Sequence, residues 1–377
     1  MNKVLLGDVA VEHKETCKGS KDGYPIVGLE HLIPEEITLT AWDEGSENTF
    51  SKMFRKGNVL FGRRRAYLKK AAVAPFDGIC SGDITVIEAK PDRILPELLP
   101  FIIQNDDLFD FAVGKSAGSL SPRVKWEHLK NYEFKLPDME KQKELAELLW
   151  AMDNTKKSYQ KLIAATDELV KSQFMELFGD PVTNTQGREV RPFKDFMLDI
   201  RYGTSQPPTF NELGEFKFIR ATNIKAGRIT ENGMLRISAD EAAKIEKCRL
   251  NGNEIIIVRS GANTGDTCVV TDEYRDQYAG YDIIVTLNLE IANPVFFNEL
   301  MNTHYMQAII KPLTVRAAQP HINSEQVQNL PMLVVPLQEQ EQFATFVRQS
   351  DKSKFELEKA LSELTATYKR IIAENLG

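Results

Sequence analysis

Apolar residues recur every three or four positions along two long segments of the chain, and this spacing predicts two long amphipathic helices. The first segment follows Pro137 and the second follows Pro336. Proline fits just before a helix, because its missing N–H removes no helical hydrogen bond there. At about 1.5 Å per residue, roughly 40 residues make a helix of about 60 Å. A helix of this length needs a long partner to cover its apolar face.

The two segments are parts of a repeat that runs through the whole chain. Residues 122–131 match residues 320–329, an offset of 320 − 122 = 198. Residues 56–63 (KGNVLFGR) likewise match residues 251–259 (NGNEIIIVR). Solenoid repeats span only a few tens of residues, so a repeat of this length indicates a duplicated domain.

Each predicted helix has one apolar face, and the two faces have similar lengths. A pseudo-twofold repeat makes the helices leave their domains in opposite senses, which predicts an antiparallel coiled coil. Pairing between two molecules of a homodimer is the alternative. The residues predicted to face the partner helix are Leu145, Leu148, Met152, Tyr159, Leu162, Leu169, Phe343, Phe346, Leu357, Leu361, Leu364 and Tyr368.

The remaining segments carry short apolar runs separated by Gly, Pro and Asp clusters, a pattern typical of strands and turns. One helix is predicted in each copy, over residues 95–111 and 298–310. The predicted fold class is α+β, with two mixed α/β domains in pseudo-twofold repeat and two long helices. The predicted boundaries are 1–137 and 181–335 for the domains and 138–180 and 336–377 for the helices.

Composition fits two folded units. The chain has 377 residues, of which 42% are hydrophobic and 27% charged. No segment approaches eighteen apolar residues without a charge, so we expect a cytoplasmic protein without membrane contact. The four cysteines share no short spacing, which indicates neither a zinc site nor a disulfide framework.

The chain has a local basic patch but no complete catalytic motif. The formal net charge of −7 disfavours a nucleic-acid binder as a whole, but residues 63–65 (RRR) and 69–70 (KK) form a local basic patch. No catalytic motif is complete: residues 261–267 lack the lysine of a phosphate-binding P-loop, and the five histidines show no paired metal-ligand spacing. We therefore expect a protein that is not an enzyme and binds neither metal nor cofactor.

Two loops in each copy combine small residues with long hydrogen-bonding side chains. Small residues let the backbone approach phosphates, while Arg, Asn and Gln can bind base edges in the major groove. Solvated arginines and ordinary hairpin turns are the alternative for individual residues. The candidate DNA-binding residues are Arg63, Arg64, Arg65, Tyr67, Lys69, Ser119, Ser121, Arg123, Lys125, Arg220, Arg259, Ser260, Asn263, Thr264, Arg316, Gln319, His321 and Asn323.

Several of these segments together resemble the specificity subunit of Type I restriction-modification systems. Residues 172–181 (SQFMELFGDP) resemble the family's helix end and its junction into the second domain. Residues 136–142 and 335–340 resemble its helix openings, in which a proline precedes a glutamine, and residues 319–323 (QPHIN) resemble the loop before its last strand. The first copy departs from the pattern, because it lacks a counterpart of Gln319.

The resemblance implies a non-catalytic subunit with two target recognition domains, each of which binds one half of a bipartite, asymmetric DNA target. The helices would set the half-site spacing and dock two modification (methyltransferase) subunits, and restriction (endonuclease/translocase) subunits would join them. S-adenosylmethionine, ATP and Mg would be bound by those partners and serve DNA methylation and phage defence. A coiled-coil scaffold that assembles proteins without sequence-specific DNA binding is the alternative, which the acidic net charge favours.

Overall fold

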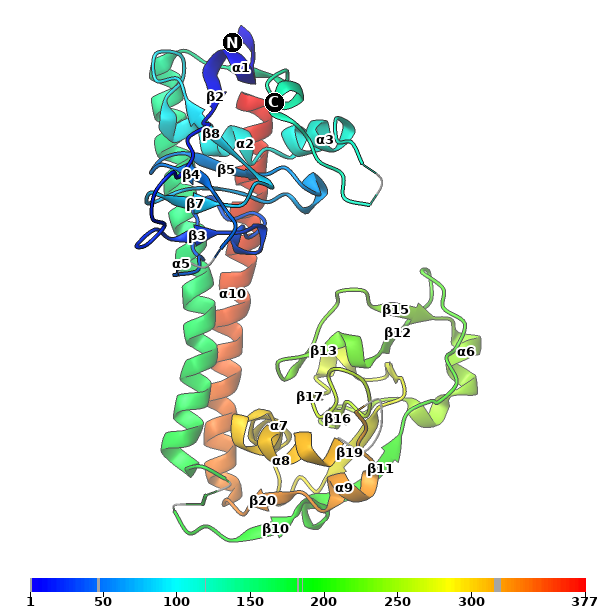
Figure 1. The fold of residues 1–377 in the computed structure, drawn as a ribbon. Coiled ribbons are helices and arrows are strands. Elements are labelled where there is room, and N and C mark those ends of the chain that lie inside the picture. Colours follow the sequence, from blue (N-terminus) through cyan, green and yellow to red (C-terminus); the bar gives the residue numbers. More distant parts are fainter. Residues whose placement is uncertain (1, 46–47, 119, 182, 185, 315–319) are drawn as a thin grey trace. The chain divides into compact units, whose positions relative to one another are not determined.

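The computed structural model describes residues 2–45, 48–118, 120–181, 183–184, 186–314 and 320–377 (Figure 1). The chain forms two compact units. The first comprises Met1–Leu162 with Leu357–Gly377, and the second comprises Ile163–Glu356. Each unit therefore contains one globular domain and one half of each long helix.

The first unit is built on a four-stranded antiparallel sheet in the order β2-β8-β5-β6 and a three-stranded sheet in the order β3-β7-β4. A two-stranded sheet, β1-β9, leads into the first long helix. The strands are β1 Asn2–Leu5, β2 Ala10–Glu12, β3 Ile26–Val27, β4 Lys52–Phe54, β5 Val59–Gly62, β6 Ala71–Val73, β7 Gly78–Cys80, β8 Ile84–Ala89 and β9 Glu133–Leu136. The α-helices are α1 Leu6–Val9, α2 Leu99–Ile103, α3 Asp106–Gly114 and α4 Trp126–Leu129, and the 3-10 helices are η1 Leu29–His31, η2 Ala66–Leu68 and η3 Pro96–Leu98.

The second unit repeats this plan with sheets in the orders β11-β19-β16-β17 and β15-β12-β18, and adds the hairpin β13-β14. The pair β10-β20 takes the place of β1-β9. The strands are β10 Val190–Pro192, β11 Met197–Tyr202, β12 Phe216–Ile219, β13 Ile224–Lys225, β14 Arg228–Ile229, β15 Leu235–Ile237, β16 Ile255–Ile257, β17 Thr267–Val269, β18 Tyr278–Ala279, β19 Ile283–Leu287 and β20 Pro331–Leu333. The helices are α6 Ala239–Lys244, α7 Pro294–Asn302, α8 His304–Thr314 and α9 Ser324–Gln328, with 3-10 helices η4 Phe193–Phe196, η5 Ala221–Asn223, η6 Glu246–Cys248 and η7 Asp272–Tyr274.

The single helix predicted in each copy is wrong, because each copy has two consecutive helices instead. In the first copy Asn105 is extended, and its side chain accepts a hydrogen bond from Asp107 N–H, which starts α3. In the second copy the extended residue Thr303 separates α7 from α8. Apolar periodicity continues across both breaks and so did not reveal them.

The two long helices are α5, Met139–Phe178, and α10, Leu337–Leu376, with 40 residues each. They pack antiparallel within the chain (Figure 1), which confirms the predicted helical pair over the homodimer alternative. In the first unit Phe101 contacts both Trp150 of α5 and Tyr368 of α10. In the second unit Phe174 of α5 contacts Phe343 of α10.

Three predicted contact positions on α5 lie on its exposed side. Leu148, Leu162 and Leu169 are 47%, 51% and 52% exposed, while the residues that follow them, Leu149, Ile163 and Val170, are buried or half-buried. Each pair of neighbouring apolar residues fits the three-and-four spacing equally well. The other predicted positions, which are buried or half-buried, are Leu145, Met152, Tyr159, Phe343, Phe346, Leu357, Leu361, Leu364 and Tyr368.

A buried glutamine fixes the start of each long helix to its own domain. Gln142 accepts a hydrogen bond from Leu95 N–H (2.8 Å) and donates one to Pro137 O (2.9 Å). Gln340, at an offset of 340 − 142 = 198, makes the same two bonds with Asn293 N–H (2.8 Å) and Val335 O (2.7 Å). The duplication therefore extends to individual hydrogen bonds.

No helix among the described residues is long and apolar enough to cross a membrane.

Candidate nucleic-acid interface

In the first unit, the loop after β5 lies beside the loop before α4. Arg65 N–H donates to Pro122 O (2.8 Å), and Val124 N–H donates to Arg63 O (3.0 Å). Arg64 and Arg123 form a bridge between the same two segments. Two loops separated by about sixty residues thus form one surface, and both were predicted to bind DNA.

Asp83, just before β8, holds two of the predicted arginines on this surface. Arg123 donates to both Asp83 carboxylate oxygens (2.7 and 3.2 Å). Arg64 lies 3.4 Å from the same carboxylate and donates to Ser121 Oγ (3.1 and 2.9 Å). The hydrogen bond from Arg123 lowers the pKa of Asp83, so the carboxylate is ionised at neutral pH. We call Asp83, Arg64 and Arg123 the Asp83 cluster.

The other predicted residues of the first unit differ in their environments. Arg65 is exposed and has a left-handed backbone with φ 54°, while Tyr67 and Lys125 are also exposed. Lys69 is paired with Asp106 (2.6 Å). Arg63 has a buried Nε without a hydrogen-bond partner among the described residues. Ser119 lies outside the described residues.

The second unit repeats the loop contact with other side chains. Gly261 N–H donates to Pro320 O (3.3 Å), and Ile322 N–H donates to Arg259 O (2.9 Å). Ser260 and His321 form the bridge that Arg64 and Arg123 form in the first unit. The backbone frame is therefore common to both copies, while the side chains on it differ.

The guanidinium of Arg259 lies between two tyrosine rings. Its carbon is 4.3 Å from the ring centre of Tyr202 and 4.4 Å from that of Tyr281. Arg259 N–H donates to Asp282 Oδ1 (3.1 Å), and burial raises the pKa of Asp282 to about 6. Arg259 Nε is buried and has no hydrogen-bond partner among the described residues. The two rings therefore orient the guanidinium of Arg259.

Several predicted residues of the second unit make contacts within the fold. Asn323 accepts a hydrogen bond from Gln326 N–H (2.8 Å) and caps α9. Thr264 donates to Gly261 O (2.6 Å), and Asn263 Nδ2 donates to Ala221 O (3.4 Å). Arg220 donates to Gly233 O (2.8 Å) and keeps a buried Nε without a partner among the described residues. Arg316 and Gln319 lie outside the described residues.

Sequence reasoning did not select Asp83, Tyr202, Tyr281 or Asp282 as site residues. Asp83 and Asp282 occupy the same place in two segments that match in the repeat, residues 81–84 and 280–283. This match was the sequence signal that could have selected both aspartates. Tyr202 ends β11, far from Arg259 in sequence, and only strand pairing brings the two together.

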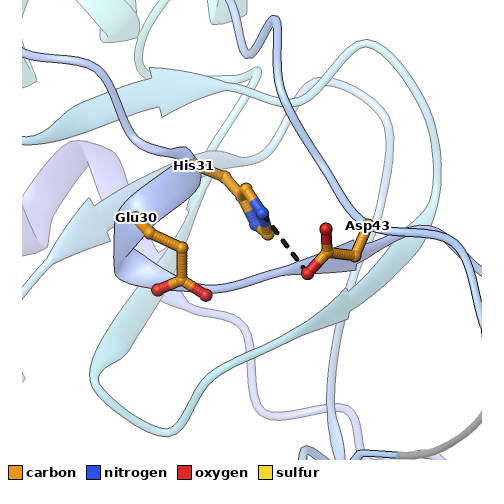
Figure 2. A group of neighbouring side chains, drawn as sticks. All are labelled: Glu30, His31 and Asp43. Carbon is orange, nitrogen blue, oxygen red and sulfur yellow. Dashed lines mark ion pairs between the residues drawn. The ribbon is translucent and has the colours of Figure 1, made fainter. Parts of the chain in front are cut away.

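Among the described residues, the three side chains suited by type and proximity to hold a metal ion are Glu30, His31 and Asp43 (Figure 2). Gly28 N–H donates to His31 Nδ1 (2.9 Å), so the neutral ring carries its proton on Nε2. That nitrogen faces Asp43 Oδ2 at 3.5 Å. A protonated Nε2 is not available as a metal ligand, so the trio fits a hydrogen-bonded cluster better than a metal site.

The family model of the Type I restriction modification DNA specificity domain matches residues 3–165 and 189–365. A Type I restriction enzyme EcoDI specificity subunit from Escherichia coli is 26% identical over 179 residues, which are 46% of this chain and 36% of that protein. The chain thus spans well under two thirds of that relative's length in this match.

Two solved structures share the fold along nearly the whole chain. The S subunit of a type I restriction-modification system from M. genitalium has a TM-score of 0.63 at 14% identity and covers 98% of this chain and 94% of its own. A chain from a study of complex assembly and conformational transition of the type I R-M system has a TM-score of 0.56 at 20% identity, with coverage of 99% and 97%.

Proposed function

Because the chain belongs to the Type I restriction modification DNA specificity family, we propose that each of its two domains binds one half of a bipartite, asymmetric DNA target. The family provides DNA specificity and not catalysis. The two domains would therefore select the sequence on which partner subunits act. Such a complex would work on chromosomal and invading DNA in the cytoplasm.

One observation carries this proposal: the same pair of loops meets at the same place in both units, with different side chains on it. The first copy has the Asp83 cluster, and the second has Arg259 between two tyrosines. A guanidinium held in a fixed plane can donate two hydrogen bonds to the O6 and N7 atoms of guanine. Since the arginines are held differently, we expect the two half-sites to differ in sequence.

The acidic net charge is compatible with DNA binding, because attraction to phosphates depends on local charge. Arg65, Tyr67 and Lys125 are exposed on or beside the joined loops of the first unit. These residues are suited to phosphate and base contacts, while Asn323 and Thr264 are better explained by their contacts within the fold.

We also propose that the paired helices dock two modification subunits, which restriction subunits join. Leu148, Leu162, Leu169 and Phe355 expose large apolar surfaces on the long helices. S-adenosylmethionine, ATP and Mg would be bound by those partners, and this chain would hold none of them. A scaffold without DNA selectivity is the alternative, and it is favoured only by the net charge.

The test is a domain exchange in the assembled complex. Residues 1–137 are replaced by the corresponding domain of another family member, and the methylated adenines of the host genome are mapped. The proposal requires one half of the methylated sequence to change while the other half and the spacing persist. The reciprocal exchange of residues 181–335 serves as the matched control and should change the other half. Methylation at unchanged sites after either exchange would refute the proposal.

A further inference from the structure

A cavity of about 280 Å³ lies in the first unit, where the turn carrying Glu35, helix α3 and both long helices meet. Its apolar walls include Ile37, Phe109, Met152, Leu364 and Ile372. This volume is close to the lower limit of small-molecule sites, which run from roughly 300 to 1,000 Å³. Of the candidate DNA-binding residues, Lys69 also lines this cavity.

Three polar atoms in the cavity wall are buried without a hydrogen-bond partner among the described residues: Asn105 Nδ2, Tyr368 Oη and Asp153 Oδ2. Asp153 Oδ2 has an ion pair with Lys157, which leaves the two donors, Asn105 Nδ2 and Tyr368 Oη. The Asn105 side-chain oxygen accepts from Asp107 N–H (3.2 Å), which fixes the amide and leaves its NH₂ group as a donor. Burial and the negative charge of Asp153 raise the pKa of Tyr368, so its hydroxyl keeps its proton. Leaving a buried donor unpaired costs about 1–3 kcal/mol, so both groups favour an acceptor inside the cavity.

The equivalent position in the second unit has no such donor. Val170 stands where the repeat places Tyr368, since 368 − 170 = 198. Asp351, the counterpart of Asp153, is paired with Arg228 of the adjacent domain. The polar cavity wall is therefore a feature of the first copy, not a consequence of the shared fold.

Several charged groups at the cavity are held in ion pairs, while Lys156 donates to Glu35 O (3.3 Å) and Asp107 also lines the wall. Lys69 contacts Asp106 (2.6 Å), Lys369 contacts Glu35 (3.0 Å), and the buried Asp153 contacts Lys157 (2.7 Å). A neutral ligand leaves these pairs intact, and the wall carries both signs of charge, from Lys156 and Asp107, so it offers no net preference for an ion.

We propose that this cavity binds a neutral bicyclic heteroaromatic molecule, whose ring nitrogen or carbonyl oxygen accepts hydrogen bonds from Tyr368 and Asn105. The apolar walls bury the flat ring system, and the two donors orient its acceptor edge. Neutral purine-type bases belong to this chemical class.

Benzimidazole and indole are suitable probes, because they have nearly the same size and shape but only benzimidazole has a ring-nitrogen acceptor. Each is titrated into the full-length chain at pH 8, where both are neutral, and binding is followed by calorimetry. We expect benzimidazole to bind about tenfold more tightly than indole, as one buried hydrogen bond would give.

Tyr368→Phe keeps the ring and removes the unpaired hydroxyl, so the chain should fold while the preference for benzimidazole disappears. Tyr159→Phe, the same change elsewhere on the helical pair, should retain the preference. Equal affinities in the unsubstituted chain, no measurable binding of either probe, or a preference that survives Tyr368→Phe would each overturn the proposal.

Discussion

The guanidinium of Arg259 is oriented by two tyrosine rings, whose centres lie 4.3 and 4.4 Å from its carbon, and an oriented guanidinium is suited to contact a base edge. We expect Arg259→Ala to weaken binding of the cognate DNA about 10- to 100-fold and to relax selectivity at one position of the second half-site only. Fluorescence anisotropy with the assembled complex and DNAs varied at single positions measures both effects. Arg191→Ala removes an exposed arginine paired with Glu189 and is the matched control. Equal losses at both half-sites would contradict this role.

Asp282 should make the stability of the second unit depend on pH. Its pKa of about 6 in the folded chain exceeds the ordinary value of 3.8, because burial disfavours the charged carboxylate. The folded state therefore keeps the Asp282 proton up to a higher pH than the unfolded state does. As a result, the free energy of unfolding falls as pH rises from about 4 to about 6.

Asp282→Asn removes this penalty and can still accept the hydrogen bond from Arg259 N–H. We expect the free energy of unfolding to rise by about 1–3 kcal/mol at pH 7.5 and to change little near pH 4. Denaturant titrations at the two pH values measure the difference. The exposed Asp272→Asn provides a comparison that should show no such pH dependence. A loss of stability at pH 7.5 would show that the ionised carboxylate is needed.

At the scale of elements, each long helix depends on the glutamine near its start. Gln142→Leu leaves the N–H of the half-buried Leu95 without its acceptor, and Gln340→Leu does the same to the half-buried Asn293. We expect a loss of about 1–3 kcal/mol in each case, confined to the unit that contains the substitution. Hydrogen exchange of backbone amides resolves the two units. Gln160→Leu alters an exposed position of α5 and should leave the backbone amides of both units protected from exchange. Equal deprotection of both units by Gln142→Leu would show that the units unfold together.

At the scale of the whole molecule, the proposed function makes the helical pair the determinant of half-site spacing. Seven residues inserted after Leu162 and seven after Glu358 preserve the apolar register, since two turns hold about seven residues. They add about 10 Å of helix, which corresponds to about three base pairs of DNA. We expect the methylated sequence to keep both halves and gain about three base pairs between them, as mapped by genome-wide methylation sequencing. An equal insertion beside the exposed Leu213 should leave the spacing unchanged. If the number of base pairs between the half-sites stays the same in the helix variant, the helices do not determine the half-site spacing.

The sequence alone determined the duplication, the two long helices and the equivalent sequence positions of the candidate loops in the two copies. These features are local or repeated, so periodicity and internal matching reveal them. It could not distinguish Leu148 from Leu149, because both satisfy the helical spacing and only packing buries one of them. Nor could it show that Asp83 holds Arg64 and Arg123, or that Tyr202 and Tyr281 enclose Arg259, since strand pairing joins these distant residues. Tertiary structure alone decided which arginines are already paired with a carboxylate and which are oriented by aromatic rings, because both arrangements join residues that are far apart in sequence.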